Sequence, residues 1–241
     1  MSTSAAALAL KADKAILRKD VCTAAQAVRR RGPRTMSLRS IPRRVVENLT
    51  RSISAKALTD RILATPSLID AQSISCYLSM PTGEIDTGLL VRALLRAGKT
   101  LYVPKIDRRT DGKMDMLRVY DEDDLSSLPS GVWGIKEPGA TRNGSPRANA
   151  MDSGLDVILV PALAFDRALC RLGHGKGYYD RFIRAHTEAL GRTPTLVGLA
   201  LEEQLLEPDT IPTGAHDWKM DHIITCGSLV SSRVATGPED K

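Results

Sequence analysis

Aromatic side chains are scarce in this sequence, where Phe, Trp and Tyr together make up 4% of the residues. A hydrophobic core must therefore be built mainly from Leu, Val, Ile and Ala. No apolar run approaches the roughly 18 residues that a membrane-spanning helix needs, so no membrane segment is predicted. The four cysteines form no Cys-x-x-Cys pair and fit no zinc spacing, a pattern typical of reduced thiols inside the cell.

The first ten residues lack the basic segment that begins a secretory signal. We therefore expect a cytoplasmic protein, with import into mitochondria left open.

Acidic residues are absent between positions 29 and 44, where seven arginines gather. The whole chain has a formal net charge of +6, so its basic character lies in this segment and the rest is close to neutral. An arginine-rich tract can bind nucleic acid, but this one has no aromatic side chain on which a base could stack. We predict a solvated basic insertion rather than a nucleic-acid site.

Apolar periodicity predicts a single domain over residues 11–226, preceded by disordered residues 1–10 and followed by a polar tail over 227–241. Strands and helices alternate along this domain, which favours the α/β class: three layers, a mainly parallel sheet with helices on both faces, Rossmann-like. The predicted strands are 73–78, 100–104, 114–120 at an edge, 157–161, 195–200 and 222–225. One predicted helix begins at Lys11. The other predicted helices cover 45–64, 85–97, 121–128, 178–190 and 202–206, and a long loop covers 129–154.

One glycine-rich stretch stands out between Arg171 and Asp180. Gly173, Gly175 and Gly177 alternate with side chains, and Lys176 places an ammonium among them. Glycine lets a ligand approach backbone N–H groups closely, and a helix N-terminus adds a positive dipole end. The succession of strand, glycine loop and helix thus predicts a phosphate cradle, although the spacing matches neither the Walker A motif nor the dinucleotide fingerprint.

Lys14 and Arg18 lie one turn apart on the first predicted helix. They form either a solvated basic face or a pair that grips a polyphosphate, and their spacing alone leaves both interpretations open. Glu84 and Lys105 follow predicted strands, at the edge where open α/β sheets bind ligands. The pair His216-Asp217 comes before the last predicted strand.

Several short motifs, read in series, resemble the 5-formyltetrahydrofolate cyclo-ligase (5,10-methenyltetrahydrofolate synthetase) family. The most specific is the block from Arg171 to Asp180, Arg-Leu-Gly-His-Gly-Lys-Gly-Tyr-Tyr-Asp. The others occur in the order of the family: Lys14-x-x-Leu17-Arg18, Tyr77 to Met80 with Glu84 to Thr87, Val103 to Lys105, Trp133 to Pro138, Pro161 with Phe165-Asp166, and His216-Asp217. The resemblance spans about residues 11–226.

The resemblance implies that ATP and Mg²⁺ are used to convert 5-formyltetrahydrofolate into 5,10-methenyltetrahydrofolate, with release of ADP and phosphate. By position in the motifs, Lys14 and Arg18 would bind phosphates, while Leu78 and Glu84 would contact the folate. The glycine loop would bind ATP through Arg171, Leu172, Gly173, His174, Gly175, Lys176, Gly177, Tyr178 and Tyr179, and its stretch from His174 to Tyr178 would also meet the folate. Asp180 and Asp217 would hold Mg²⁺.

Among these residues we expect Lys176, Arg18 and Tyr178 to be catalytic, in a monomeric enzyme. The chemistry needs little covalent help, because phosphorylation of the formyl oxygen makes it a leaving group that attack by N10 expels. His174 occupies a position where relatives often carry Arg, and a neutral His would give less charge to the phosphates. Two alternatives remain: another phosphate-handling enzyme, such as a sugar-phosphate isomerase or CoA transferase, or a nucleic-acid-binding protein that uses 29–44.

Overall fold

The computed structural model describes residues 3–31, 55–80, 85–107, 113–131 and 134–232, and its centre is a seven-stranded sheet. The strand order is β12-β11-β9-β6-β1-β2-β3. Neighbours from β11 to β2 are parallel, whereas β12 and β3 pair antiparallel at the two edges. The strands are β1 (Ser73–Ser75), β2 (Thr100–Ile106), β3 (Met114–Val119), β6 (Val157–Val160), β9 (Thr195–Leu199), β11 (His222–Ile224) and β12 (Leu229–Ser231).

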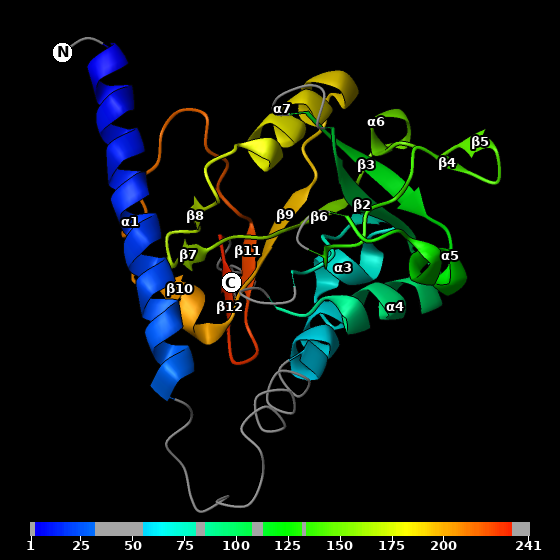
Figure 1. The fold of residues 1–241 in the computed structure, drawn as a ribbon, viewed down its shortest axis with the longest axis horizontal. Helices are drawn as coiled ribbons and strands as arrows, with labels where there is room; N and C mark the ends of the chain where they lie inside the picture. The colour runs from blue at the N-terminus through cyan, green and yellow to red at the C-terminus, as the bar shows by residue number, and fades with distance from the viewer. Residues whose placement is uncertain (1–2, 32–54, 81–84, 108–112, 132–133, 233–241) are drawn as a thin grey trace, which may run out of the picture.

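Helices cover both faces of this sheet (Figure 1). One face packs against the helical residues 55–63, α3 (Pro66–Asp70), α4 (Gly88–Arg96) and α5 (Glu122–Ser127), which share one buried cluster with it. The other face packs against α6 (Ala150–Ser153) and α7 (Tyr178–Leu190) through a second cluster. The predicted three-layer α/β arrangement with a mainly parallel sheet is therefore confirmed.

Burial on both faces of the sheet explains why the central strands are apolar without interruption. In β6, Val157 and Leu159 belong to the first buried cluster, whereas Ile158 and Val160 belong to the second. Successive side chains of a strand point to opposite faces, so a strand covered on both sides must be apolar at every position. All four side chains are at most 1% exposed, which makes β6 part of the rigid frame beneath the loops at its carboxyl end.

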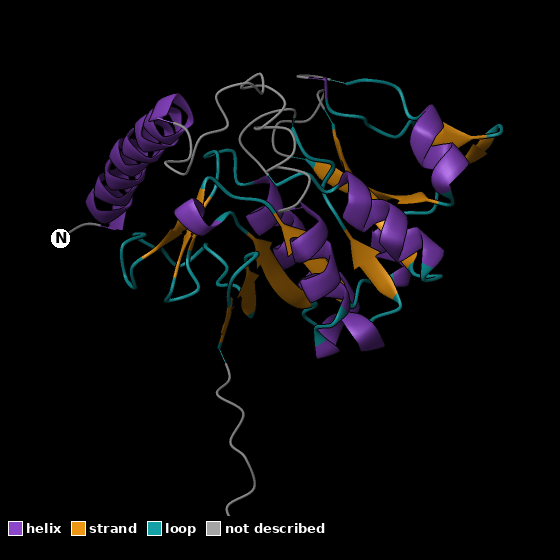
Figure 2. Cartoon of the chain, turned by 90° about the horizontal axis from the view of Figure 1, so that it is seen from below, coloured by secondary structure: helices purple, strands orange, loops and turns teal. Residues whose placement is uncertain are grey.

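Helix α1 (Thr3–Arg31) corrects the prediction for the N-terminus. The helix begins at Thr3 instead of Lys11, so residues 3–10 are helical and not disordered. Their run of Ala and Leu has high helix propensity, and Leu10 contacts the backbone at Gly214. Figure 2 shows this helix at one end of the molecule, outside the layers that enclose the main sheet.

The predicted insertion and the helix after it fall partly outside the described residues. Residues 29–31 continue α1, and 32–44 are outside the described ranges. Of the predicted helix 45–64, the described part is helical over 55–63. Pro66 follows its end but also begins α3, because proline is well suited to the first position of a helix.

A second, three-stranded sheet was not predicted. It contains β7 (Ala164–Asp166), β8 (Arg171–Leu172) and β10 (Leu205–Leu206), in the order β10-β7-β8. The glycine loop therefore follows β8, and the predicted direct passage from strand 157–161 into the loop is wrong. Strands of two or three residues are too short to leave a periodic pattern in the sequence.

Smaller corrections concern the predicted loop, the last strands and the tail. The loop 129–154 contains the hairpin of β4 (Thr141–Arg142) and β5 (Ser145–Pro146) as well as α6. The predicted helix 202–206 is a short 3₁₀ helix, Glu202–Gln204, followed by β10. The predicted tail includes the edge strand β12, which pairs with β11, and residues 233–241 are outside the described ranges. No helix in the described parts of the chain is long and apolar enough to cross a membrane.

Candidate active site

The glycine loop, residues 173–177, joins β8 to α7 in a conformation that needs glycine. Gly175 has a φ of +89° and Gly177 a φ of +65°, the left-handed region that side chains rarely adopt. Gly177 is also the N-cap residue of α7, where no side chain caps the helix. Uncapped N–H groups and the positive end of the helix dipole favour an anion at this place.

Helix α1 brings Arg18 to this loop and Lys14 to Asp217. Arg18 Nε donates to the carbonyl oxygen of Gly173 at 2.9 Å. Its guanidinium lies over Gly175, where an added Cβ would be only 3.2 Å from Arg18 Cζ. Lys14 Nζ donates to Asp217 Oδ2 at 2.5 Å. Both side chains are turned to the protein, so the interpretation as a solvated basic face is excluded.

The two candidate metal ligands come from distant segments and meet beside the loop. Asp180 accepts a hydrogen bond from Arg171 Nη2 at 2.7 Å and lies 3.4 Å from the backbone nitrogen of Trp218. Asp217 accepts from the backbone nitrogen of Gly214 in addition to Lys14. The residue after Asp217 thus contacts Asp180, which places both carboxylates in one region of the site.

These two carboxylates suit magnesium. Mg²⁺ is usually bound by one or two carboxylates and completes its shell with phosphate oxygens and water. Within the described ranges, no group of three His, Cys, Asp or Glu side chains is gathered as a metal site. A pair of carboxylates beside a phosphate cradle therefore fits a metal that arrives with a polyphosphate better than a metal held by the protein alone.

The remaining loop residues differ in what they offer. Lys176 is exposed, and its carbonyl oxygen accepts from Arg181 Nη2 at 2.5 Å. Loss of hydration, and then repulsion from Arg18 and Arg171, lowers the pKa of His174. His174 is therefore neutral near pH 7 and adds no charge for a phosphate, as expected from its residue type.

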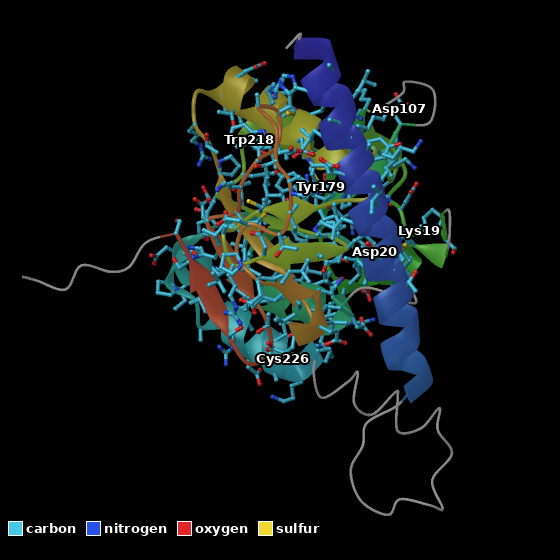
Figure 3. All side chains as sticks on the ribbon, turned by 90° about the vertical axis from the view of Figure 1, so that its left-hand side faces the viewer. Lys19, Asp20, Asp107, Tyr179, Trp218 and Cys226 are labelled. Atoms are coloured by element: carbon cyan, nitrogen blue, oxygen red, sulfur yellow. The ribbon has the colours of Figure 1, made fainter. Side chains whose placement is uncertain are left out.

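The aromatic pair after the loop is partly buried against the second core cluster. The guanidinium carbon of Arg181 lies 5.8 Å from the ring centre of Tyr178, and that of Arg171 lies 5.9 Å from the ring centre of Tyr179. Figure 3 labels Tyr179 and Trp218 on the face across which α1 runs. Leu172 is fully buried in a core cluster with Ala164, Cys170 and Ile211, so its contact with ATP stays a prediction.

The segment after β1 carries the candidate folate contact Leu78. Leu78 is partly buried against the first core cluster. Its neighbours are held by Thr87, whose hydroxyl donates to the Tyr77 carbonyl at 2.8 Å and accepts from the Ser79 nitrogen at 3.1 Å. Glu84, the other candidate folate contact, lies outside the described residues.

The structure shows contacts that the sequence did not predict for Arg181, Lys105 and Asp166. Arg181 folds back along the loop, and an added Cβ at Gly177 would be 3.1 Å from its Nη1. Lys105 pairs with Glu137 at 3.3 Å at the end of β2. Asp166 is fully buried and accepts from the backbone nitrogens of Cys170 and Ile211. The Phe165-Asp166 motif was the available signal for Asp166, because a buried carboxylate needs such donors.

Asp166 connects two parts of the site. Its Oδ1 accepts hydrogen bonds within the turn that leads into β8 and the glycine loop. Its Oδ2 accepts from Ile211, at the start of the segment that carries Asp217. The candidate site as a whole thus combines a glycine loop at a helix N-terminus, cations from the first helix and two carboxylates that could hold a metal, all on an α/β scaffold.

Comparison with known proteins agrees with that class. The family model described as the 5-formyltetrahydrofolate cyclo-ligase family matches residues 12–226. The chain therefore belongs to the 5-formyltetrahydrofolate cyclo-ligase family. It is 35% identical over 207 residues to the 5-formyltetrahydrofolate cyclo-ligase of Saccharomyces cerevisiae, covering 79% of this chain and 93% of the relative. It is 34% identical over 180 residues to a probable 5-formyltetrahydrofolate cyclo-ligase of Caenorhabditis elegans, covering 73% and 82%.

A solved structure supports the same assignment. The Aquifex aeolicus 5,10-methenyltetrahydrofolate synthetase superimposes with a TM-score of 0.64 at 27% identity, covering 94% of this chain and 96% of that one. The fold prediction and the family resemblance are thus confirmed. The roles of individual residues stay predictions. The contacts described above show where these residues lie.

Proposed function

We propose that this enzyme converts 5-formyltetrahydrofolate into 5,10-methenyltetrahydrofolate with ATP and Mg²⁺, releasing ADP and phosphate. One observation carries the proposal: Arg18 from the N-terminal helix meets Gly173 and Gly175 of the glycine loop. This contact brings a guanidinium next to the backbone of a glycine loop and the N-terminus of α7, and these groups are donors suited to a triphosphate.

The reaction divides into two steps that the site would assist by alignment and charge. The formyl oxygen attacks the γ-phosphorus of ATP, and the bond from the γ-phosphorus to the bridging oxygen breaks to release ADP. N10 then attacks the activated formyl carbon and loses its proton, the carbon–oxygen bond breaks, and phosphate leaves with that proton as the ring closes. Arg18, Lys176 and the loop N–H groups would stabilise the charge that moves onto the phosphate oxygens.

Substrate position would come from the apolar and aromatic groups around the loop. Leu78 and Tyr178 are both partly buried, so they can offer flat apolar surface to a pterin and keep water from the activated formyl group. Asp180 and Asp217 would hold Mg²⁺, which when bound neutralises charge on the phosphates. We also propose that the enzyme acts as a monomer.

An absorbance assay tests this function. Purified protein, 5-formyltetrahydrofolate and ATP with Mg²⁺ should produce the near-ultraviolet absorbance of the methenyl product, with one ADP formed for each product. Omitting ATP, or adding EDTA in excess of the metal, should stop the increase. Absence of product in the complete mixture, with protein that is folded by circular dichroism, would contradict the proposal.

A further inference from the structure

The two candidate metal ligands hold two of the candidate phosphate cations. Lys14 pairs with Asp217 at 2.5 Å, with side chains 12% and 26% exposed. Arg171 pairs with Asp180 at 2.7 Å, with side chains 8% and 20% exposed. These pairs are more shielded from water than surface ion pairs, so breaking either one without replacement has a substantial cost.

We propose that Asp217 and Asp180 make this site selective for the metal complex of a triphosphate over the metal-free form. The inference rests on the proposed function, because it takes the nucleotide site as given. A metal-free triphosphate meets Lys14 and Arg171 already neutralised, and it must approach two carboxylates of its own charge. Two of the candidate phosphate cations are therefore withheld from it.

A metal complex of the triphosphate offers a new partner both to the two aspartates and to the two cations. The divalent cation can take the place of Lys14 and Arg171 as the partner of the aspartates. The released ammonium and guanidinium can then bind the phosphate oxygens that enter with the metal. A metal ion alone also binds weakly, because it displaces both cations while nothing accepts them. Arg18 is outside this exchange, since it donates to the carbonyl of Gly173.

A purely structural role for the pairs makes the opposite prediction. If the two ion pairs only fasten α1 to the segment of Asp217 and β8 to α7, removing one partner should weaken the binding of every ligand. If they act as counter-ions, removing one partner should strengthen binding of the ligand that competes for the other. The sign of the change therefore separates the two roles, whatever its size.

The first experiment measures ATP binding by calorimetry without folate, once in EDTA and once in excess Mg²⁺. In Asp217→Asn, we expect ATP in EDTA to bind about tenfold more tightly than in the wild type, because Lys14 is released. ATP with Mg²⁺ should bind more weakly, since a metal ligand is lost. Asp20→Asn is the matched control, because Asp20 is exposed on α1, the helix of Lys14, and its substitution removes the same charge (Figure 3).

The second experiment reverses the exchange and uses Mn²⁺ alone, followed by electron paramagnetic resonance. Lys14→Gln should bind Mn²⁺ several-fold more tightly than the wild type, whereas Lys19→Gln, at an exposed position of the same helix, should not. Failure of both variants to tighten their ligand, or equal tightening by the controls, would overturn the proposed selectivity. If the wild type bound no ATP in either buffer, the nucleotide site itself would be refuted.

Discussion

Lys176 supplies an exposed ammonium within the glycine loop. We expect Lys176→Ala to lower turnover by at least about 100-fold, the scale of losing one donor to the transferred phosphoryl group. The near-ultraviolet assay measures the rate, and circular dichroism checks the fold. Lys56→Ala, on a surface helix where Lys56 pairs with Asp60, is the control. Turnover of Lys176→Ala equal to that of the control would refute the phosphate role.

Single residues also show what the sequence could and could not predict. The left-handed backbone of Gly175 and Gly177 could be predicted, because a run of alternating glycines is a local signal. The pairing of Lys14 with Asp217 could not, since 203 positions separate them and only the folded chain brings them together. Nor could the contact of His186, which is buried and accepts a hydrogen bond from the backbone nitrogen of Leu155, 31 positions away.

The glycine loop as an element depends on both its backbone and its contact with α1. Gly175→Ala should lose ATP affinity by about tenfold or more, because the added Cβ displaces Arg18 and strains the backbone. Gly191→Ala is a matched control: Gly191 has a φ of +66° at the end of α7, and nothing lies within 4 Å of an added Cβ. Both variants should lose similar stability in thermal unfolding.

Only Gly175→Ala should lose ATP affinity in the calorimetric titration. An equal loss in Gly191→Ala would mean that general destabilisation, and not the contact with Arg18, is the cause.

Helix α5 is joined to the segment after the β4–β5 hairpin by a buried ion pair. Arg147 donates to both oxygens of Asp124 at 2.7 and 2.6 Å. Burial raises the pKa of Asp124, but hydrogen bonds from Arg147 and from the Tyr120 nitrogen outweigh it and leave that pKa below its ordinary value. The stabilisation is thus complete above the unfolded pKa of about 4 and is lost as the pH falls through the folded pKa.

We therefore expect Asp124→Asn to lower the free energy of unfolding at pH 7 by about 3 kcal/mol, because Arg147 stays buried without its counter-ion. Urea unfolding between pH 7 and pH 3 should show a smaller loss of stability with acid in this variant than in the wild type. Asp123→Asn, at an exposed position of the same helix, should keep the wild-type profile. Parallel profiles for wild type and Asp124→Asn would refute the linkage.

Elements differ in how well the sequence predicts them. The helix 178–190 was predicted with its observed bounds, because its apolar spacing is clear and glycines flank it. The strand predicted over 114–120 at an edge is found there as β3, because its apolar and polar residues alternate. Strands β7 and β8 were missed because they are short, and the early start of α1 was missed because its first turns are exposed and have no amphipathic pattern to detect.

At the scale of the whole molecule, the site is assembled from the two ends of the chain. The N-terminal helix supplies Lys14 and Arg18, while the loop and both aspartates come from the C-terminal half. The central claim is that residues 173–177 and these cations bind the phosphates of ATP. A crystal structure with Mg²⁺ and a non-hydrolysable ATP analogue tests it most directly. The phosphate oxygens should lie within hydrogen-bond distance of the loop N–H groups and Arg18; phosphates bound elsewhere, with the loop unoccupied, would contradict the account.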